Sequence, residues 1–343
     1  MEFLTDYGLF FAKTLTFLIA LLLATAIIAG AAGRARKAEK GHLDVRSVND
    51  NIAHNRQKLS DSLLKDGERK AVLKARRKDE KRKRKKGEQG PNKHLFVLDF
   101  KGDMKAGAAQ SLREEITAVL GLASAHDEIV VRLESPGGMV HSYGFASSQL
   151  DRIRKSGVPL TVCVDKVAAS GGYMMACVAD KILAAPFAYI GSIGVLAQVP
   201  NFHRLLKKHD VDVEILTAGE YKRTLTMLGE NTEKGREKFI RDLQETHNHF
   251  KDFVQAHRAN LDIDQVATGE VWLGTRAHEI GLVDEVMTSD EYIISQLDSA
   301  RIFEVSYLIK KPLHRKVGMA AEESADRLAM RWWQRLTQSS YKL

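Results

Sequence analysis

Apolar residues follow a repeating pattern from Lys93 to about residue 310. Short, almost continuous apolar runs alternate with longer stretches in which apolar residues recur every three or four positions. The first kind of run is typical of buried strands and the second of amphipathic helices. The pattern predicts strands at 94–100, 128–134, 159–165, 181–186 and 211–217, and helices at 108–124, 139–157 and about 232–259, with a smaller helical region near 272–282.

The order of these elements indicates the fold class. Continuous apolar strands that alternate with helices predict βαβ units, in which the strands are parallel and helices cover both faces of the sheet. A composition with 44% hydrophobic and 28% charged residues is ordinary for a globular domain. We therefore expect an α/β domain with a parallel sheet over residues 93–312.

The amino-terminal 33 residues have a different pattern. Thr14 to Ala32 is an uncharged run of 19 residues. As a helix, a run of this length covers the ~30 Å of a bilayer core. A cleaved signal peptide is the alternative, because Ala29-Gly30-Ala31 resembles a cleavage site. The acidic residues Glu2 and Asp6 and the length of the run favour an uncleaved transmembrane anchor over residues 1–33.

Charge separates residues 34–92 from the rest of the chain. Between Arg34 and Lys86 there are 20 Lys and Arg against 8 Asp and Glu, so this segment carries +12, while the whole chain carries +8 and the remainder −4. Few large apolar side chains are present to offset chain entropy, which predicts a basic, charged stalk that is at most partly helical. The basic run lacks interleaved aromatic residues, so it favours a solvated linker or contact with anionic lipid over specific nucleic-acid binding.

The tail and the cysteines complete this organisation. Residues 313–343 form an amphipathic tail, whose apolar stripe includes Trp332 and Trp333. The stripe predicts packing against the globular domain or another protomer, or else a helix on the membrane surface. Cys163 and Cys177 lie in apolar runs and are expected to be packed free thiols, so neither a disulfide nor a metal site is predicted.

Two glycine-rich junctions follow predicted strands: Pro136-Gly137-Gly138 and Ala169-Ser170-Gly171-Gly172. The carboxyl ends of parallel strands are where such folds bind ligands. Glycines permit unusual φ angles and close backbone approach, so the first junction could offer N–H groups to an oxyanion. Ser170 begins a helix at the second junction, where free N–H groups favour a nucleophile. Taken alone, the second junction is more typical of an N-cap and a tight turn, and the first of an ordinary loop; neither has a phosphate-binding glycine motif.

In combination, these motifs resemble one known family. Four segments match it in order and spacing: SPGG at 135–138, AASGGYMMA at 168–176, GSIGV at 191–195 and AGEYKRTLT at 218–226. The family is the SppA/SohB family of membrane-bound serine peptidases, and the resemblance covers about residues 93–310. It implies a fold like that of the Clp protease and crotonase superfamily, with no cofactor.

The resemblance implies roles for individual residues. The family's serine nucleophile corresponds to Ser170, and its lysine general base corresponds to Lys222, which lies 52 residues later. Ser192 corresponds to the serine that hydrogen-bonds this lysine and orients it. The oxyanion hole corresponds to Gly171 together with a glycine of the first junction, for which the candidates are Gly138 and Gly137.

The implied mechanism is that of a Ser/Lys dyad. A neutral lysine amine takes the proton of Ser170 as the serine oxygen attacks the scissile carbonyl, and water then hydrolyses the acyl-enzyme. A cleft that excludes water favours the neutral amine, because desolvation disfavours the ammonium. His203 offers a Ser-His-Asp alternative, but its apolar neighbours Phe202, Leu205 and Leu206 indicate a surface helix.

These features together predict a serine endopeptidase of the bacterial inner membrane that acts on signal peptides or other apolar peptides. A crotonase-type acyl-CoA enzyme and an inactive membrane scaffold are the alternatives, but neither needs a Ser/Lys pair at this spacing. A homo-oligomer is expected, because the chain holds one copy of the serine unit and double-length relatives hold two; the lysine could then come from the adjoining chain. The basic stalk favours a cytoplasmic domain by the positive-inside rule, whereas the resemblance implies the periplasmic side.

Overall fold

The chain forms two units in a computed structural model, which describes residues 10–11, 13–19, 41–64 and 91–309 and the single positions 67, 74, 78 and 82. The larger unit is Leu43–Tyr307, and the other comprises residues 1–42 and 308–343. Most of the predicted membrane span and the whole predicted tail lie outside the described residues. Within the described ranges, no helix is long and apolar enough to cross a membrane.

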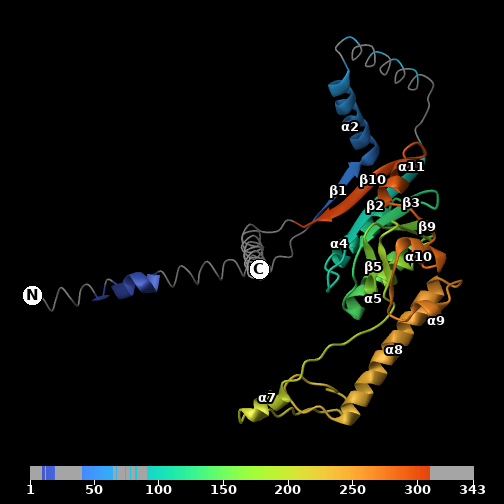
Figure 1. Cartoon of the computed structure of the whole chain (residues 1–343). Coiled ribbons are helices and arrows are strands. Elements are labelled where there is room, and N and C mark those ends of the chain that lie inside the picture. The colour runs from blue at the N-terminus through green and yellow to red at the C-terminus, as the bar shows by residue number, and fades with distance from the viewer. Residues whose placement is uncertain are drawn as a thin grey trace, which may run out of the picture. The chain divides into compact units, whose positions relative to one another are not determined.

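A seven-stranded sheet forms the centre of the larger unit (Figure 1). Its order is β1-β10-β2-β3-β4-β6-β9, and the pairs from β10 to β9 are parallel. A three-stranded sheet has the order β5-β7-β8. The predicted α/β fold with a largely parallel sheet is therefore confirmed. The strands are β1 (His42–Ser47), β2 (Lys93–Lys101), β3 (Glu128–Glu134), β4 (Leu160–Val164), β5 (Val167–Ala169), β6 (Lys181–Ala184), β7 (Tyr189–Gly191), β8 (Val271–Leu273), β9 (Glu285–Val286) and β10 (Ala300–Leu308).

Helices occupy most of the connections between these strands. Six of them, α4, α5, α6, α8, α9 and α10, supply buried residues to the main core, and the short helix α11 supplies Ile293 to a second core. The helices are α2 (Val48–Leu63), α4 (Ala109–Leu120), α5 (Val140–Lys155), α6 (Gly171–Ala176), α7 (His203–Lys208), α8 (Glu233–His257), α9 (Ile263–Val266), α10 (Gly274–Glu279) and α11 (Ser289–Ser295).

The two faces of the seven-stranded sheet differ along the strands. Side chains alternate between the faces of a strand, so Leu98 and Phe100 of β2 enter the main core while Leu95 and Val97 enter the second core. Farther along β2, the second face carries the exposed Asp99 in place of an apolar residue. The second face is therefore apolar near the amino ends of the strands and charged near their carboxyl ends.

The sheet begins earlier in the chain than residue 93. Strand β1 and helix α2 lie within residues 34–92, where the sequence predicted a stalk. The side chain of Asn49 in α2 accepts a hydrogen bond from Ile302 N at 2.7 Å and donates to Leu297 O and Ala300 O, both at 3.2 Å. These bonds attach a polar segment to β10, a strand about 250 residues away in sequence, without requiring a large apolar surface.

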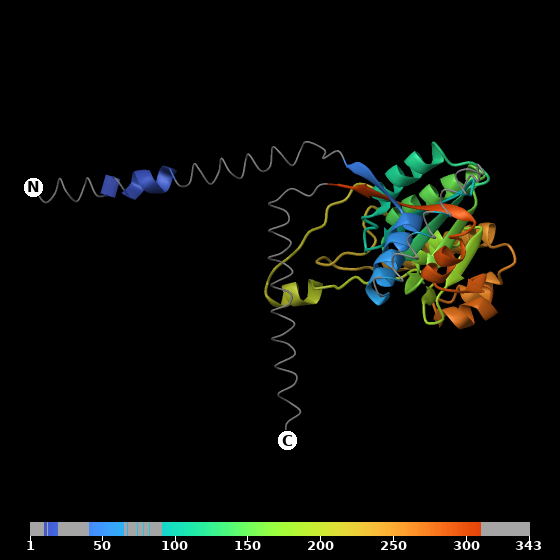
Figure 2. The same ribbon diagram turned by 90° about the horizontal axis from the view of Figure 1, so that it is seen from above.

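Within the larger unit, an extended arm leaves the sheet region after β7. We define the arm as residues 196–245, in which Gly229 is the one buried residue. It includes α7 and the first half of α8, and α7 lies apart from the sheet in both views (Figures 1 and 2). The strand predicted at 211–217 is wrong: these residues are neither helix nor strand, because on the arm they have no neighbouring strand to pair with.

Candidate active site

Ser170 lies between β5 and α6 in an unusual backbone conformation. Its φ of 53° and ψ of −120° are outside the regions that non-glycine residues favour. Two backbone hydrogen bonds hold this conformation, from Ser170 N to Gly191 O at 2.8 Å and from Ala169 N to Ser135 O at 3.0 Å. Such strain costs about 1–3 kcal/mol and is concentrated at functional sites. The serine is half-buried, so its hydroxyl is held in place and still open to a ligand.

A pocket of about 590 Å³ opens beside Ser170. Both glycine-rich junctions contribute to it, so the structure brings together Ser170, Gly137, Gly138 and Gly171 as the sequence predicted. The rest of the wall is mainly apolar and comes from five separate parts of the chain: Met104, Val140, Met174, Val195 with Leu196, and Phe250. A largely apolar pocket of this size can hold an apolar group of a ligand.

The two glycines of the first junction have different hydrogen bonds. The N–H of Gly137 donates to Ser135 Oγ at 3.1 Å. The N–H of Gly138 has no acceptor among the described residues. Gly171 is the first residue of α6, so its N–H has no acceptor within the helix. The pocket therefore has two free amides, those of Gly138 and Gly171, near the serine.

Ser192 also lines the pocket, directly after β7. Its φ is 52°, and its N–H donates to Glu270 O at 2.6 Å. The preceding Gly191 has a φ of +107°, and a Cβ there would lie 2.8 Å from the ring of Trp272. Pairing of β7 with β8 thus fixes Ser192 in a second strained conformation on the wall of the pocket.

Lys222 is not among the residues that line this pocket. It is exposed on the arm, in a loop attached to the first turn of α8 by an ion pair between Lys234 and Glu220 at 2.6 Å. Lys234 precedes His247 of the pocket wall by 13 residues on α8, a separation of about 20 Å along a helix. Within one chain, the described structure does not bring Lys222 and Ser170 together.

Two residues of α8 belong to the pocket although the sequence did not indicate them. His247 and Phe250 line it together with Thr246, and this spacing places all three on one helix face. The Nε2 atom of His247 is buried and has no hydrogen-bond partner in the part of the chain that the structure describes. The histidine that the sequence suggested, His203, begins α7 on the arm and does not line the pocket. The spacing of 246 and 250 was the available signal, but only the fold shows which face of α8 meets the pocket.

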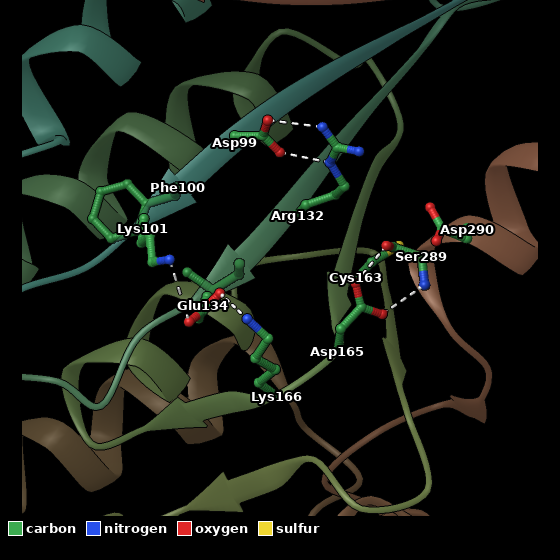
Figure 3. Close-up of a pocket in the computed structure, with 11 residues that line it drawn as sticks. Asp99, Phe100, Lys101, Arg132, Glu134, Cys163, Asp165, Lys166, Ser289 and Asp290 are labelled. Atoms are coloured by element: carbon green, nitrogen blue, oxygen red, sulfur yellow. Dashed lines mark hydrogen bonds and ion pairs between the residues drawn. The ribbon is translucent and has the colours of Figure 1, made fainter. Parts of the chain in front are cut away.

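A second hollow lies on the other face of the sheet, near the carboxyl ends of β2, β3 and β4 (Figure 3). This charged hollow has a volume of about 390 Å³. Arg132 bonds both oxygens of Asp99, at 2.6 and 2.8 Å, and Glu304 at 2.8 Å. Glu134 pairs with Lys166 at 3.1 Å and Lys101 at 3.7 Å. The hydrogen bond to Asp99 raises the pKa of Arg132, so these charges stabilise one another.

The described residues also bear on the predictions about cysteines. Cys163 and Cys177 are both free and buried, which confirms that they are packed thiols. Burial raises the pKa of each thiol and makes it a poor nucleophile. In the described part of the chain, no group of three His, Cys, Asp or Glu side chains could hold a metal ion.

Comparison with known proteins agrees with these features. The model for the N-terminal part of peptidase family S49 matches residues 2–150, and the model for peptidase family S49 matches residues 152–301. A protein of Haemophilus influenzae described as a probable protease SohB is 50% identical over 341 residues, which cover 96% of each chain. A probable protease SohB of Buchnera aphidicola subsp. Schlechtendalia chinensis is 49% identical over 306 residues, or 86% of this chain and 100% of the relative. Protease 4 of Haemophilus influenzae is 28% identical over 179 residues, or 50% of this chain and 29% of the relative.

The two family models together extend over nearly the whole chain, and the relatives at about half identity are aligned over most of their own length. Both glycine-rich junctions, and with them Ser170, lie inside the matched ranges. The resemblance expected from the motifs is thus confirmed, and the chain belongs to peptidase family S49.

Proposed function

We propose that this peptidase is a serine endopeptidase with a Ser170/Lys222 dyad that is completed between two protomers. The observation that carries the proposal is the strained Ser170 beside two free amides, Gly138 N–H and Gly171 N–H, in a neutral pocket. A nucleophile needs a fixed position and donors for the oxyanion, and both are present. The base is the one component that a single chain does not supply to this pocket.

Each step of the proposed reaction has a group to perform it. Ser170 Oγ forms a bond to the scissile carbonyl carbon while its proton passes to Lys222 Nζ. The carbonyl π electrons move to the oxygen, which accepts hydrogen bonds from the amides of Gly138 and Gly171. When the C–N bond breaks, the lysine returns the proton to the leaving amine. Water, deprotonated by the same lysine, then releases the acyl group from Ser170.

The exposure of the arm supports the proposal that the general base comes from a neighbouring protomer. Large apolar side chains on the arm are open to solvent, with Leu196 at 87% and Leu216 at 89% exposure. A run of 50 residues with one buried member does not stabilise itself by burial, so it needs a partner surface. A second protomer that covers the arm would also desolvate Lys222, which favours the neutral amine that a base requires. The position of Ser192 on the pocket wall supports a role in hydrogen-bonding and orienting the incoming amine.

The proposed substrates are apolar peptides, including signal peptides, at the inner membrane. The apolar wall of the pocket supports this substrate class, because burial of an apolar side chain favours binding by about 25 cal/mol per Å². The uncharged run from Thr14 to Ala32 supports attachment to the membrane. Contact of the basic segment with anionic lipid follows from its net positive charge.

Mixing of two inactive variants tests the shared site. Full-length Ser170→Ala and Lys222→Ala proteins, purified in detergent, should each lack hydrolysis of a fluorogenic apolar peptide. A random mixture of the two should recover about a quarter of wild-type activity, because each site then needs an intact serine from one chain and an intact lysine from its neighbour.

Two controls accompany this experiment. His203→Ala should remain active, because His203 lies on the arm away from the pocket. A fluorophosphonate probe should label wild-type protein and fail to label Ser170→Ala. Mixtures without recovery would refute the shared site, and activity retained in Lys222→Ala would refute the dyad.

A further inference from the structure

A buried pair of side chains, Ser135 and Tyr143, lies directly behind the two free amides of the pocket. Both residues have 0% exposure. Ser135 follows β3 and immediately precedes the first glycine junction, and Tyr143 lies in the first turn of α5. Neither is the nucleophile or the base, so the proposed reaction leaves them without a role.

The hydrogen bonds of this pair run in one direction. The hydroxyl of Tyr143 donates to Asp103 O at 2.8 Å and lies 2.6 Å from Ser135 Oγ. A phenol has one hydrogen to donate, so the hydroxyl of Ser135 must donate to Tyr143. The remaining acceptor position of Ser135 Oγ then receives the N–H of Gly137 at 3.1 Å.

This chain of bonds constrains the amide of Gly138. The Gly138 N–H belongs to the peptide group after Gly137, so its direction depends on the dihedral angles of Gly137. Gly137 has a φ of +87°, a region where glycine is flexible and has no side chain to restrain it. The hydrogen bond from its N–H to Ser135 fixes the peptide group before Gly137. A second bond, from Met139 N to Met104 O at 2.9 Å, fixes the other end of the loop.

The same pair packs against the second amide. A Cβ on Gly171 would lie 2.4 Å from the ring of Tyr143, and a Cβ on Gly172 would lie 2.5 Å from Ser135 O. The amino end of α6 therefore rests directly on the pair. A Cβ on Gly102 would lie 2.3 Å from Ser135 Oγ and 2.5 Å from Tyr143 OH, so the backbone of Gly102 also packs directly against the two hydroxyl groups.

We propose that Tyr143, acting through Ser135, is a positioning residue for the oxyanion hole, because it sets the direction of the Gly138 amide relative to the Gly171 amide. This inference rests on the proposed serine-peptidase function. A donor must lie within a few tenths of an ångström of its place to stabilise the oxyanion, which forms only in the transition state. Loss of the positioning bond should therefore lower kcat and leave substrate binding unchanged.

The experiment replaces Tyr143 by Phe in the full-length protein and compares it with a matched variant. Tyr143→Phe keeps the ring against Gly171 and removes the hydroxyl. We expect kcat to fall about 10- to 100-fold, less than the loss of a whole oxyanion donor, while KM changes less than about 2-fold. The matched control is Tyr173→Phe, because Tyr173 is also at 0% exposure and its hydroxyl also donates to a backbone carbonyl, Leu282 O at 2.9 Å. Tyr173→Phe should leave kcat unchanged.

An inhibitor series separates positioning from general stability. A peptide aldehyde forms a hemiacetal with Ser170, whose oxygen occupies the oxyanion hole, whereas the matching peptide amide binds without a covalent bond. In Tyr143→Phe, the affinity for the aldehyde should fall by the same factor as kcat, and the affinity for the amide should not change. Ser135→Ala should reproduce this pattern and serves as the second variant if Tyr143→Phe does not fold.

The outcomes distinguish this inference from the proposed function. Wild-type protein that does not react with a fluorophosphonate at Ser170 contradicts the serine mechanism itself. Wild-type protein that reacts, combined with an unchanged kcat in both Tyr143→Phe and Ser135→Ala, contradicts the positioning role alone. An equal fall of kcat in Tyr143→Phe and Tyr173→Phe also contradicts it, because a loss of core stability would then explain both.

Discussion

The Ser170 pocket and the charged hollow lie near the carboxyl ends of neighbouring parallel strands, and they differ in how their polar groups are satisfied. In the charged hollow, Arg132 is paired with both Asp99 and Glu304, and Glu134 with two lysines. In the Ser170 pocket, two backbone amides have no acceptor among the residues that the structure describes, and the serine backbone is strained. A dense set of charges is therefore a poor guide to chemistry here. Unsatisfied donors around a strained residue are the better guide, because a substrate can satisfy them.

The largest effect should distinguish the serines of the two regions. Ser170→Ala should lower kcat/KM for an apolar peptide by at least about 1,000-fold, because the nucleophile is lost. Ser289 of the charged hollow donates to Asp165, and Ser289→Ala should retain nearly full activity. Steady-state hydrolysis of one fluorogenic peptide by both variants makes the comparison. Equal activity in the two variants would remove the distinction between the regions.

The next effect concerns space beside the nucleophile. A Cβ on Gly137 would lie 2.7 Å from both Ala169 O and Ser170 Cβ, so Gly137→Ala should displace the serine and lower kcat by about 100-fold or more. Gly157 is a matched control, because it also has a positive φ, +77°, but nothing within 4 Å of an added Cβ. Both variants should lose about 1–2 kcal/mol of stability from the backbone conformation. Gly157→Ala should keep its activity, and a similar loss in both would contradict the steric argument.

A buried carboxyl outside both regions extends the comparison to stability. Glu115 is 5% exposed, one of its oxygens accepts a hydrogen bond from Tyr307 N at 2.7 Å, and the other has no partner within the described ranges. Burial, only partly offset by that hydrogen bond, raises the pKa of Glu115 from 4.5 to about 7. Below the unfolded pKa both states are protonated. Between the two pKa values the unfolded state ionises first, so rising pH destabilises the native protein.

The expected loss of stability with rising pH can be measured with a variant that cannot ionise at this position. Relative to wild type, Glu115→Gln should gain on the order of 3 kcal/mol in the free energy of unfolding as pH rises from 5 to 8, with no further gain above about pH 8. Urea unfolding of the full-length protein at several pH values tests it. Glu114→Gln, at the half-buried neighbouring position, should stay within about 0.5 kcal/mol of wild type at each pH. A gain that is independent of pH would contradict ionisation of Glu115 as its cause.

The smallest effect should come from the charged hollow itself. Arg132→Met removes the bonds to Asp99 and Glu304 and leaves two carboxylates without their partner. The free energy of unfolding should fall by about 1–2 kcal/mol, with kcat and KM unchanged. Arg113→Met is the control, because Arg113 forms an exposed pair with Glu114 and should cost less than about 0.5 kcal/mol. A loss of activity in Arg132→Met would show that the hollow has a function beyond stability.

Local patterns in the sequence predicted much of this fold and of the pocket. The apolar runs around 94–100, 128–134 and 159–165 predicted β2, β3 and β4, because a buried strand needs apolar side chains on both faces. The glycines after two of these strands and the position of Ser170 predicted the pocket. Both signals are local in sequence, since they depend on the preferences of consecutive residues and on the known side of a parallel sheet where ligands bind.

Long-range contacts decided the rest. The N–H of Gly137 donates to Ser135, which is itself bonded to Tyr143, and the Tyr143 hydroxyl donates to Asp103 O, 40 residues away in sequence. The contribution of α8 to the pocket, the pairing of β1 beside β10 and the failure of 211–217 to form a strand have the same origin. A strand needs a neighbour, and a helix face needs a surface to meet. The residues of a segment do not determine which neighbour or surface it meets. For the same reason, the separation of Lys222 from Ser170 within one chain became visible only in the tertiary structure.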